Sequence, residues 1–577
     1  MATKRKVARA TSPIRPEPAK RPRQTELVDD SSDQSRAVEQ YGYVQREFYP
    51  AEMSNERCKQ YNNNELPRPI ETLNRALEDT KLQRSQIAGG EAVVHWFKRD
   101  LRTTDNRALS LASAKAKSLG VPLVCMFIVS PQDYQAHLTS PARVDFELRT
   151  LEVMKADLAE KDIPLYATTI QERREVPGHM LHKFEEWGAK HIFCNIEYEV
   201  DELRREAKLL SHPGPSSPAP ANNTPSTPPG SKAWTKHLHE HPHLLEASSP
   251  PTPNPPTARK TFPTLFSSPI PEAPPNKYLP PETRTHLAHL WPAGEHAALT
   301  RLDHYLTTKA SAYKTSRNFP ATPATAMLSV HFSAGTLAAR TAVRCAREAN
   351  KPAQRLETGD AGLVCWISEL AWRDFYKHIL AQWPFVCMAK PFKYEYSGIE
   401  WDSSPQLFAK WCEGKTGYPI VDAAMRQLNT MGWMHNRCRM IVASFLAKDL
   451  LLDWRLGERY FMEKLIDGDF ASNNGGWGFS ASTGVDPQPY FRIFNPLLQS
   501  EKFDEGGEYI RKWVPELKGV MGKAVHDPYG RGAGAEAEKW GYPRMVVEHK
   551  VQRERALERY KKGLGRGTAN LGGGVHN

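Results

Sequence analysis

The sequence predicts an α/β domain built on a parallel sheet, followed by a second domain made only of helices. Between residues 91 and 210, short runs of apolar residues alternate with helix-like segments. Strands that are apolar on both faces are typical of a parallel sheet covered by helices on each side. Beyond residue 285, apolar residues recur at helical spacing and no alternating strand pattern is present. A chain of 577 residues is long enough for two such domains.

Four strands and one helix are expected in the α/β domain, at residues 91–210. The apolar runs place the strands at 92–97, 121–129, 164–168 and 191–198, and helical spacing predicts a helix at 141–160. The helical domain is expected at 286–560. Its predicted helices are 297–306, 335–349, 362–382, 404–412, 422–428, 434–451 and 457–466.

Three segments are expected to lie outside these domains. Residues 1–90 are predicted to be a disordered basic extension, in which 65–79 form a short helix packed on the body. Residues 211–285 hold 20 of the 46 prolines. A segment of that composition buries too little surface to offset its ordering entropy, so a linker or insertion is predicted. The glycine-rich residues 561–577 are predicted to be a flexible tail.

Composition narrows the class of protein. Lys and Arg outnumber Asp and Glu by 77 to 66, and a net charge of +11 favours a polyanionic partner, of which nucleic acid is the commonest. The eight cysteines form no C-x-x-C pair, which excludes a disulfide framework and a four-cysteine zinc site. The longest apolar run, 121–129, is too short to span a membrane.

Two basic clusters, at 4–6 and 20–23, have the spacing of a bipartite nuclear-import signal. The first 16 residues contain no acidic residue, so a mitochondrial presequence is the alternative. We therefore expect the protein in the nucleus, with the mitochondrion as the second candidate.

Polar side chains interrupt the otherwise apolar helix at 362–382. Trp366, Glu369, Arg373 and Tyr376 fall on one helical face, where a core helix would carry leucine and isoleucine. A carboxylate, a guanidinium and aromatic rings together indicate a polar pocket. The alternative is a solvated Glu–Arg pair on the surface, since side chains four residues apart on a helix contact each other.

A second stretch carries related chemistry near the middle of the helical domain. Asn436, Arg439 and Met440 share one helical face, and Arg437 points elsewhere. An amide beside a guanidinium suits an amide-rich ring or a phosphate. The neighbouring His435, taken alone, is more often a structural histidine than a ligand.

A third stretch contains two carboxylates and a glycine-rich segment. Asp467 and Asp469 lack the spacing of a calcium-binding loop, and they instead suit hydrogen bonds to N–H groups of a buried cofactor. Residues 473–476, Asn-Asn-Gly-Gly, are predicted to form a turn. The chain has no Walker phosphate loop, no dinucleotide-binding glycine motif after a strand and no nucleophile elbow.

In this order and spacing, the three stretches resemble the photolyase/cryptochrome family, and most of all its fungal class I cyclobutane pyrimidine dimer photolyases. The resemblance begins at residues 96–109, WFKRDLRTTDNRAL, and extends to about residue 503. It implies a Rossmann-like N-terminal antenna domain and a helical C-terminal domain that binds FAD. It also implies a cavity for a flipped-out pyrimidine dimer, which costs least to flip because the base pair is already damaged.

The resemblance assigns a set of residues to the FAD. Arg439 would pair with Asp467 over the flavin ring, and Asn473 would face the flavin N5 atom, where photolyases keep an asparagine. Ala326 replaces a serine of the family's diphosphate-binding segment, so one hydroxyl group is missing there. The implied FAD-binding residues are Tyr313, Thr325, Ala326, Met327, Leu328, Ser329, Trp366, Arg439, Asp467, Gly468, Asp469 and Asn473.

A second set is assigned to damaged DNA and to electron transfer. Glu369 and Asn436 would be catalytic, and Glu369 would stabilise the dimer radical anion by a hydrogen bond. Trp401 at the surface, then Trp454, then Trp477 beside the flavin would carry electrons inward. The implied DNA-binding residues are Arg317, Glu369, Trp372, Asn436, Arg437, Met440, Phe479, Arg492 and Gln499, with Phe479 standing where many bacterial members have a second stacking tryptophan.

The resemblance also implies a second chromophore, methenyltetrahydrofolate, held by His137, Asp201, Glu202 and Cys387. Asp201 replaces an asparagine of the family pattern, and Met388 replaces a lysine. The family has a further strand after residue 206 and a motif that ends in Ala-Trp. Here only the Ala-Trp pair at 233–234 is recognisable, so either the lineage has replaced that strand or an exon is misassigned.

The expected function is light-driven repair of cyclobutane pyrimidine dimers by a monomeric enzyme that binds damaged DNA. Excited, reduced FAD would donate an electron to the dimer and recover it after the ring has split. The alternative is a cryptochrome-type photoreceptor without repair activity, against which Glu369 and Asn473 argue. Repair of (6-4) photoproducts would call for two histidines at the lesion, and the sequence supplies one, His435.

Overall fold

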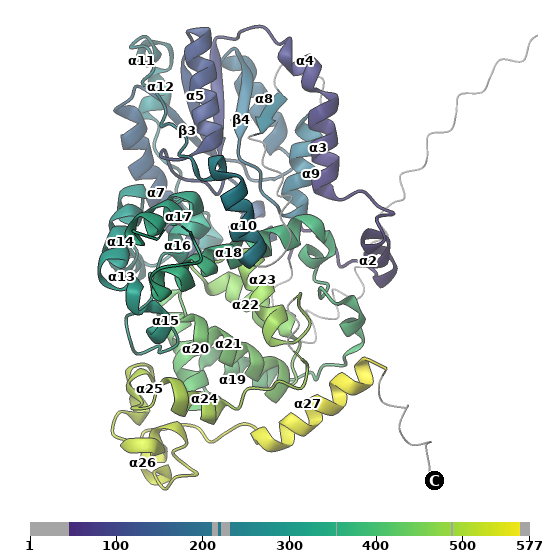
Figure 1. Cartoon of the computed structure of the whole chain (residues 1–577), viewed down its shortest axis with the longest axis vertical. Helices are drawn as coiled ribbons and strands as arrows, with labels where there is room; N and C mark the ends of the chain where they lie inside the picture. The colour runs from purple at the N-terminus through teal and green to yellow at the C-terminus, as the bar shows by residue number, and fades with distance from the viewer. Residues whose placement is uncertain (1–45, 211–216, 221–230, 354, 486–488, 566–577) are drawn as a thin grey trace, which may run out of the picture.

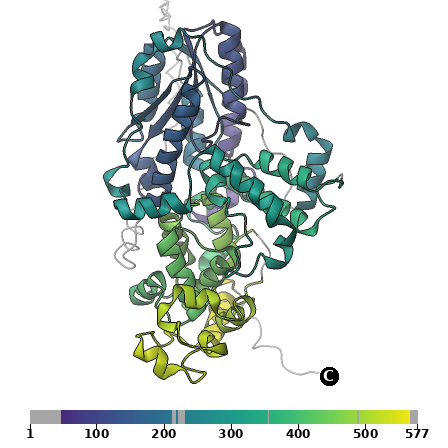
Figure 2. The same ribbon diagram turned by 90° about the vertical axis from the view of Figure 1, so that its left-hand side faces the viewer.

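The computed structural model describes residues 46–565, apart from 211–216, 221–230, 354 and 486–488. An α/β part and a helical part are stacked along the long axis of the molecule (Figures 1 and 2), which confirms the predicted fold class. The two basic clusters and the end of the predicted tail, 566–577, lie outside the described residues. Within the described part, no helix is both long enough and apolar enough to cross a membrane.

Five parallel strands form the sheet: β1 (Ala92–Phe97), β2 (Leu123–Val129), β3 (Leu165–Thr169), β4 (Ala189–Cys194) and β5 (Ser217–Pro220). Their order across the sheet is β3-β2-β1-β4-β5. β1 lies at the centre, and all six of its residues are buried. The four strands that the apolar runs predict are therefore all present, within a few residues of the expected limits.

Side chains that alternate along β1 enter two separate cores, because successive residues of a strand point to opposite faces. Val93 and Phe97 pack with residues of two helices on one face, whereas Val94 and Trp96 pack with a helix on the other. The first face is covered by α5 (Arg107–Leu119) and α7 (Pro141–Ala159), and the second by α8 (Val176–Glu186). The remaining helices of this part are α6 (Pro131–Ala136) and α9 (Val200–Leu210).

The strand β5 supplies the further strand that the sequence left unaccounted for. It pairs in parallel with β4, although it contains two prolines. It lies at the edge of the sheet, which is where strands tolerate proline. Trp234 of the recognisable Ala-Trp pair donates from Nε1 to Asp374 Oδ2 (3.0 Å), so its helix is docked on the helical part.

The segment 211–285, predicted to be a linker or insertion, was expected to bury little surface, but its described residues 231–285 pack on both parts. Leu245 joins the core of the helical part, and Phe262 and Leu265 join the core of the α/β part. The Asn254 side chain binds both the N–H and the carbonyl of Leu123 (2.8 Å each). Prolines thus alternate here with apolar anchors. The segment forms α10 (Ser231–Glu240), η1 (Pro242–Leu245), α11 (Ala258–Thr261), α12 (Pro263–Ser267) and η2 (Pro275–Lys277).

Disorder over the whole of residues 1–90 is also wrong for the part that the structure describes. Residues 46–90 are described and contain α2 (Asn55–Asn62), α3 (Pro69–Asp79) and α4 (Lys81–Ser85). The short packed helix is confirmed as α3, whose apolar face lies against α9 (Figure 1). α3 also reaches the helical part, because Arg68 at its start donates to the carbonyl of Gln382 (2.8 Å).

The helical part positions the candidate site. All seven predicted helices are present, and the one predicted at 434–451 changes at Phe445 into a short π-helical segment, η6 (Phe445–Asp449). The helices before the site are α13 (Pro281–Leu290), α14 (Glu295–Thr308), α15 (Tyr313–Ser316), α16 (Ser329–Ala334) and α17 (Ala339–Ala349). Those that surround and follow it are α18 (Ala361–Gln382), α19 (Pro405–Glu413), α20 (Pro419–Met431), α21 (Asn436–Ser444), α22 (Trp454–Lys464), α23 (Phe470–Ser480), α24 (Pro496–Phe503), α25 (Glu508–Trp513), α26 (Gly534–Lys539) and α27 (His549–Gly563).

Candidate functional site

A cavity of about 330 Å³ lies in the helical part, between α16, α18, α21 and α23. Every residue that the resemblance assigns to FAD lines it, except Gly468. Glu369, Asn436, Met440 and Trp477, which the resemblance assigns to the lesion or to electron transfer, line the same cavity. Segments from residue 313 to residue 480 therefore converge on one space.

The segment 325–329 forms part of the wall just before α16. Met327 has a left-handed backbone conformation (φ 50°), which is uncommon for a residue with a side chain. Its carbonyl accepts a hydrogen bond from Arg301 (3.2 Å), and the Ser329 hydroxyl accepts one from the Trp433 indole (3.2 Å). Strained backbone that its surroundings hold in place is typical of ligand-binding segments.

Arg439 and Asp467 form the ion pair that the resemblance implies. Arg439 Nη2 donates to both carboxylate oxygens of Asp467 (2.8 and 3.0 Å), and its Nε donates to the carbonyl of Met434 (2.8 Å). The Asp467 side chain is almost fully buried, so the ion pair offsets part of the cost of removing this carboxylate from water.

Asp469 begins α23 and supplies the second carboxylate. It accepts a hydrogen bond from the backbone of Ala471 (3.2 Å) and lies 2.9 Å from Lys377 Nζ. Burial disfavours its charged form, but Lys377 and Arg373 outweigh burial and hold the pKa of Asp469 below its ordinary value. Gly468, between the two carboxylates, instead offers its carbonyl to Ser333 Oγ (2.9 Å).

Residues 473–476 are helical, so the predicted turn is wrong. They lie within α23, where Gly475 permits close packing: a Cβ atom there would lie 2.2 Å from the Tyr376 ring of α18. Asn473 donates from its amide to the carbonyl (2.8 Å) and the carboxylate (3.0 Å) of Glu458 in α22. These bonds fix the orientation of the amide in the cavity wall.

The polar face of α18 belongs to a pocket and is not a surface Glu–Arg pair. Glu369 and Arg373 both line the cavity, but they do not pair with each other in the described structure. Glu369 lies 2.5 Å from Arg317, and Arg373 donates to the carbonyl of Phe332 (3.1 Å). The guanidinium of Arg317 also lies over the Tyr313 ring, 5.2 Å from its centroid.

The other residues assigned to DNA lie outside the cavity lining. Trp372 is 42% exposed on α18. Arg437 donates to Asn318 Oδ1 (2.8 Å) and lies over the Phe503 ring (4.3 Å to the centroid). Phe479, Arg492 and Gln499 do not line the cavity either; Arg492 is exposed, whereas Phe479 and Gln499 are half-buried.

His435 is the structural histidine that the sequence indicated. It caps α21 by accepting a hydrogen bond on Nδ1 from the backbone of Arg437 (3.2 Å). Burial, followed by the nearby Arg439 and Arg437, lowers the pKa of His435 to about 4. The ring is therefore neutral at physiological pH and does not line the cavity.

The three tryptophans assigned to electron transfer lie at different depths. Trp477 lines the cavity, Trp454 is buried in the core behind it, and Trp401 is half-buried. A backbone bond from Asp402 to Leu451 (2.8 Å) brings the segment of Trp401 beside the segment that leads to Trp454. Sequence reasoning missed Trp411, whose ring centroid lies 6.0 Å from that of Trp477.

The residues assigned to a folate come together, but as a closed polar cluster. His137 lies 3.1 Å from Asp201 and 2.5 Å from Glu199, a carboxylate that the sequence did not single out. Burial disfavours the charged imidazole, yet Glu199 and Asp201 outweigh it and raise the pKa of His137 well above its ordinary value. Tyr49 packs edge-on against the His137 ring (5.6 Å between centroids).

A folate does not fit this arrangement. The adjoining cavity, of about 100 Å³, is lined by His137 and Glu202 but by neither Asp201 nor Cys387. Cys387 is buried, and the N-terminal segment that carries Tyr49 covers the cluster.

Comparison with known proteins identifies the family. The family model described as the FAD binding domain of DNA photolyase matches residues 366–562, and the one described as DNA photolyase matches residues 93–212. Deoxyribodipyrimidine photo-lyase of Neurospora crassa is 54% identical over 559 residues, which cover 92% of this chain and 91% of the relative. The Escherichia coli protein of the same name is 38% identical over 486 residues, 81% of this chain and 98% of the relative.

Solved structures agree with these matches. The crystal structure of a class III photolyase of Agrobacterium tumefaciens superposes with a TM-score of 0.70 at 30% sequence identity. The match covers 82% of this chain and 98% of the Agrobacterium chain. The two family models match the two parts of the fold in the same order, and the cavity lies in the part that matches the FAD-binding model. The chain belongs to the photolyase/cryptochrome family.

Proposed function

We propose that the protein binds FAD in the 330 Å³ cavity and uses light to repair cyclobutane pyrimidine dimers in DNA. One observation carries the proposal: all but one of the residues assigned to the flavin line the same space as Glu369, Asn436 and Met440, which are assigned to the dimer. Asp467, Asp469 and Asn473 lie on one side of it, and Glu369 and Asn436 contribute from other helices. The similarity to photo-lyases over nine-tenths of the chain supports the same conclusion.

The chemistry of the cavity suits FAD. Arg373 Nε and Ser480 Oγ are buried polar atoms of the lining without a hydrogen-bond partner in the described structure. Such atoms are costly unless a ligand or water satisfies them. Asp467, Asp469 and Asn473 would accept and donate hydrogen bonds at the amide-rich edge of the flavin, and residues 325–329 would hold the diphosphate. Bound and reduced, FAD would supply the electron that opens the dimer and would recover it.

The protein side chains would set the electrostatics of that exchange. The Arg439–Asp467 pair places a cation and an anion together in the wall, so the pair adds polarity without net charge. Lys377 and Arg373 keep Asp469 ionised, so it remains a hydrogen-bond acceptor. Glu458 holds the Asn473 amide, so that this side chain cannot rotate freely.

Glu369 and the arginines would handle the lesion. A hydrogen bond between Glu369 and the dimer would strengthen as the dimer becomes anionic, which lowers the barrier to splitting. Arg317, Arg437 and Arg492 would contact phosphates, and phosphate contacts position a protein on DNA without reading its sequence. The exposed Trp372 and the half-buried Phe479 would offer stacking faces to the flipped-out bases.

The decisive experiment is illumination of purified protein with an oligonucleotide that contains one thymine dimer. The flavin is first reduced chemically and bound FAD is quantified from its absorption. Loss of the dimer under blue light, with none in the dark, would support the proposal. Protein that holds reduced FAD but repairs no dimer under light would overturn it and would favour the photoreceptor alternative.

We propose that a monomer acts, because a single chain supplies every residue of the site. Import into the nucleus rests on basic clusters outside the described residues, and a relative from Saccharomyces cerevisiae, 32% identical over 571 residues, is named as mitochondrial. We propose domain limits of 91–210 and 286–560, with residues 231–285 as an insertion packed on both parts.

A further inference from the structure

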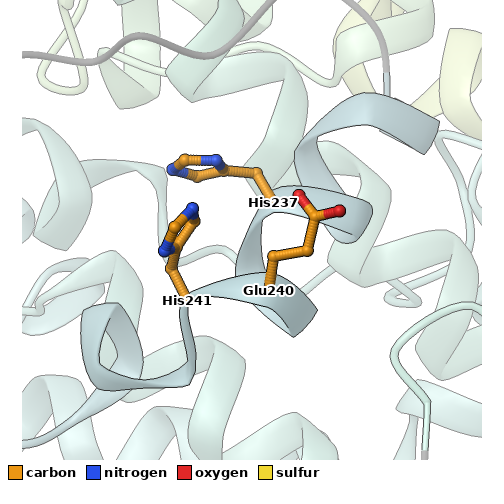
Figure 3. Close-up of side chains that lie close together, drawn as sticks. All are labelled: His237, Glu240 and His241. Carbon is orange, nitrogen blue, oxygen red and sulfur yellow. The ribbon is translucent and has the colours of Figure 1, made fainter.

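We propose that the last turn of α10 binds a transition-metal ion through His237, Glu240 and His241. One potential ligand atom from each of these side chains lies within 4.8 Å of the other two. His237 and Glu240 belong to the last turn of α10, and His241 is the first residue after it, with its backbone N–H bonded to the carbonyl of His237 (2.9 Å). Figure 3 shows the two imidazoles one above the other, 4.4 Å between ring centroids, with the glutamate on the same turn.

The helix that carries these ligands is anchored. Trp234 donates to Asp374 of α18, and Trp234 and Leu238 pack against the core of the helical part. α10 thus lies where the α/β and helical parts meet (Figure 1). His237 also borders a cavity of about 390 Å³ between the two parts, which His378 of α18 lines as well. A rigid helix holds the separation of its ligands, which favours metal binding.

The donor set selects the class of ion. Two imidazoles and one carboxylate suit Zn²⁺, and Cu²⁺ binds such sites more tightly still, whereas Ca²⁺ and Mg²⁺ require oxygen ligands. Tetrahedral bonds of about 2.0–2.1 Å need donor atoms about 3.4 Å apart. Small rotations of these side chains reach that spacing, because Glu240 and His241 are exposed. The carbonyl end of the helix also favours a cation.

Few neighbouring side chains would compete with a metal ion for these ligands. Glu240 lies 3.7 Å from the exposed Lys236, an ion pair that contributes little on a surface. His239, which lies between the ligands in sequence, projects elsewhere and lies 2.9 Å from Glu357. It therefore provides a matched control: a histidine on the same helix, of similar chemistry, outside the proposed site.

Two other groups of potential ligands in the described structure share His137 and suit a metal less well. Their carboxylates already face cations: Arg99 contacts Glu199, Arg173 contacts Asp201, and Arg205 contacts Asp133. A divalent cation would have to displace these guanidiniums from a buried cluster. At the α10 site a metal ion would have to displace, among the described side chains, only the exposed Lys236, which lies 3.7 Å from Glu240.

The test is isothermal titration of the full chain, purified without a polyhistidine tag and stripped with a chelator, using Zn²⁺ alone. We expect one ion per chain at this site, with affinity at least about tenfold lower in His237→Ala and in His241→Ala. His239→Ala should bind like the wild type. All three variants should keep their FAD and their far-UV circular dichroism, since these side chains are not part of the core.

A second readout separates binding here from binding elsewhere. Zn²⁺ should raise the melting temperature of the wild type and of His239→Ala, and it should leave His241→Ala unchanged. Unaltered Zn²⁺ affinity in both ligand variants, or an equal loss in His239→Ala, would overturn the proposal. Neither readout depends on DNA repair, so the result stands whether or not the proposed function holds.

Discussion

The guanidinium of Arg317 lies 2.5 Å from the carboxylate of Glu369, and only Glu369 of the two lines the cavity. The pair thus connects the interior of the site with its outer face, where DNA would bind. Since a phosphate competes with a carboxylate for the same guanidinium, binding of DNA would loosen Arg317 from Glu369. Glu369 would then be free to turn toward a dimer.

We expect Glu369→Ala to slow dimer splitting while binding of dimer-containing DNA changes by less than about tenfold. A charge-assisted hydrogen bond is worth roughly 1.5–3 kcal/mol, and most of that should appear only once the dimer is anionic. Repair per absorbed photon and the dissociation constant for the lesion should be measured on the same preparation. A repair yield equal to that of the wild type would contradict the role.

Replacement of Arg317 or Arg437 by Ala should weaken binding to damaged and undamaged DNA alike. Removing one arginine–phosphate interaction lowers the slope of log K against log salt by about one unit. Arg259→Ala is the control, because Arg259 is bound to Asp162 on the α/β part. An unchanged slope in both variants, measured by fluorescence anisotropy from low to high salt, would exclude these phosphate interactions.

Asp467→Asn should reduce the FAD content of the purified protein. The change leaves Arg439 without its counter-charge in a wall where Asp467 is almost fully buried, and breaking such a pair is strongly destabilising. The ratio of flavin to protein absorbance measures the loss. The double variant Asp467→Asn with Arg439→Gln should recover part of the stability lost in the single variant, as measured by thermal denaturation. Equal melting temperatures of the single and double variants would contradict an energetic coupling between Asp467 and Arg439.

Trp401→Phe should abolish photoreduction of oxidised flavin, while chemically reduced enzyme still repairs dimers. Photoreduction needs an electron from solvent, and the proposed relay begins at half-buried Trp401; repair itself returns its electron. Flavin absorption under blue light with an external thiol follows the first step. The exposed Trp540 provides a control, and Trp540→Phe should behave like the wild type. Trp411→Phe tests the alternative path through the ring next to Trp477.

Lys448 makes the free energy of unfolding of the protein depend on pH. Burial lowers the pKa of Lys448 to about 7, although Asp449 opposes the shift. Above about pH 7 the unfolded chain therefore binds more protons than the folded chain, so the free energy of unfolding rises with pH. Burial of the charged amine lowers the stability by its full amount below about pH 7, and by less as the pH rises. Lys448→Met should remove that dependence. The difference in melting temperature between variant and wild type should shrink from pH 7 to pH 9; a constant difference would contradict a neutral, buried lysine.

The sequence predicted the strands and helices of both domains well, because apolar periodicity records which faces are buried. Sequence periodicity did not predict the segments in which only single residues, separated by prolines, pack against the body. Asn254, Phe262 and Leu265 tie a proline-rich segment to the body, and single apolar residues between prolines give no period to detect. Asn-Asn-Gly-Gly was expected to turn, but Gly475 instead lets two helices approach closely around Tyr376.

In the candidate site, too, some residues could be predicted from the sequence and some contacts could not. The family resemblance, which rests on continuous stretches of sequence, led to residues that line the cavity. The partner of Glu369 could not be inferred, since Arg317 lies 52 positions away and Arg373, one helical turn on, is the nearer choice by spacing alone. Nor could the sequence show that Tyr49, from a segment expected to be disordered, covers His137.

The helix α3 contacts both α9 and α18, although it precedes both in the chain. Its apolar face, Ile70, Leu73 and Leu77, packs with Leu203 and Leu210 of α9 and with Ala381 of α18, so its native packing is complete only after roughly 300 further residues have been made. At about 5–20 residues per second, this wait lasts on the order of 15 to 60 seconds. During synthesis, part of the apolar face of α3 thus lacks its native partner in α18 for that time, although α9 is already available.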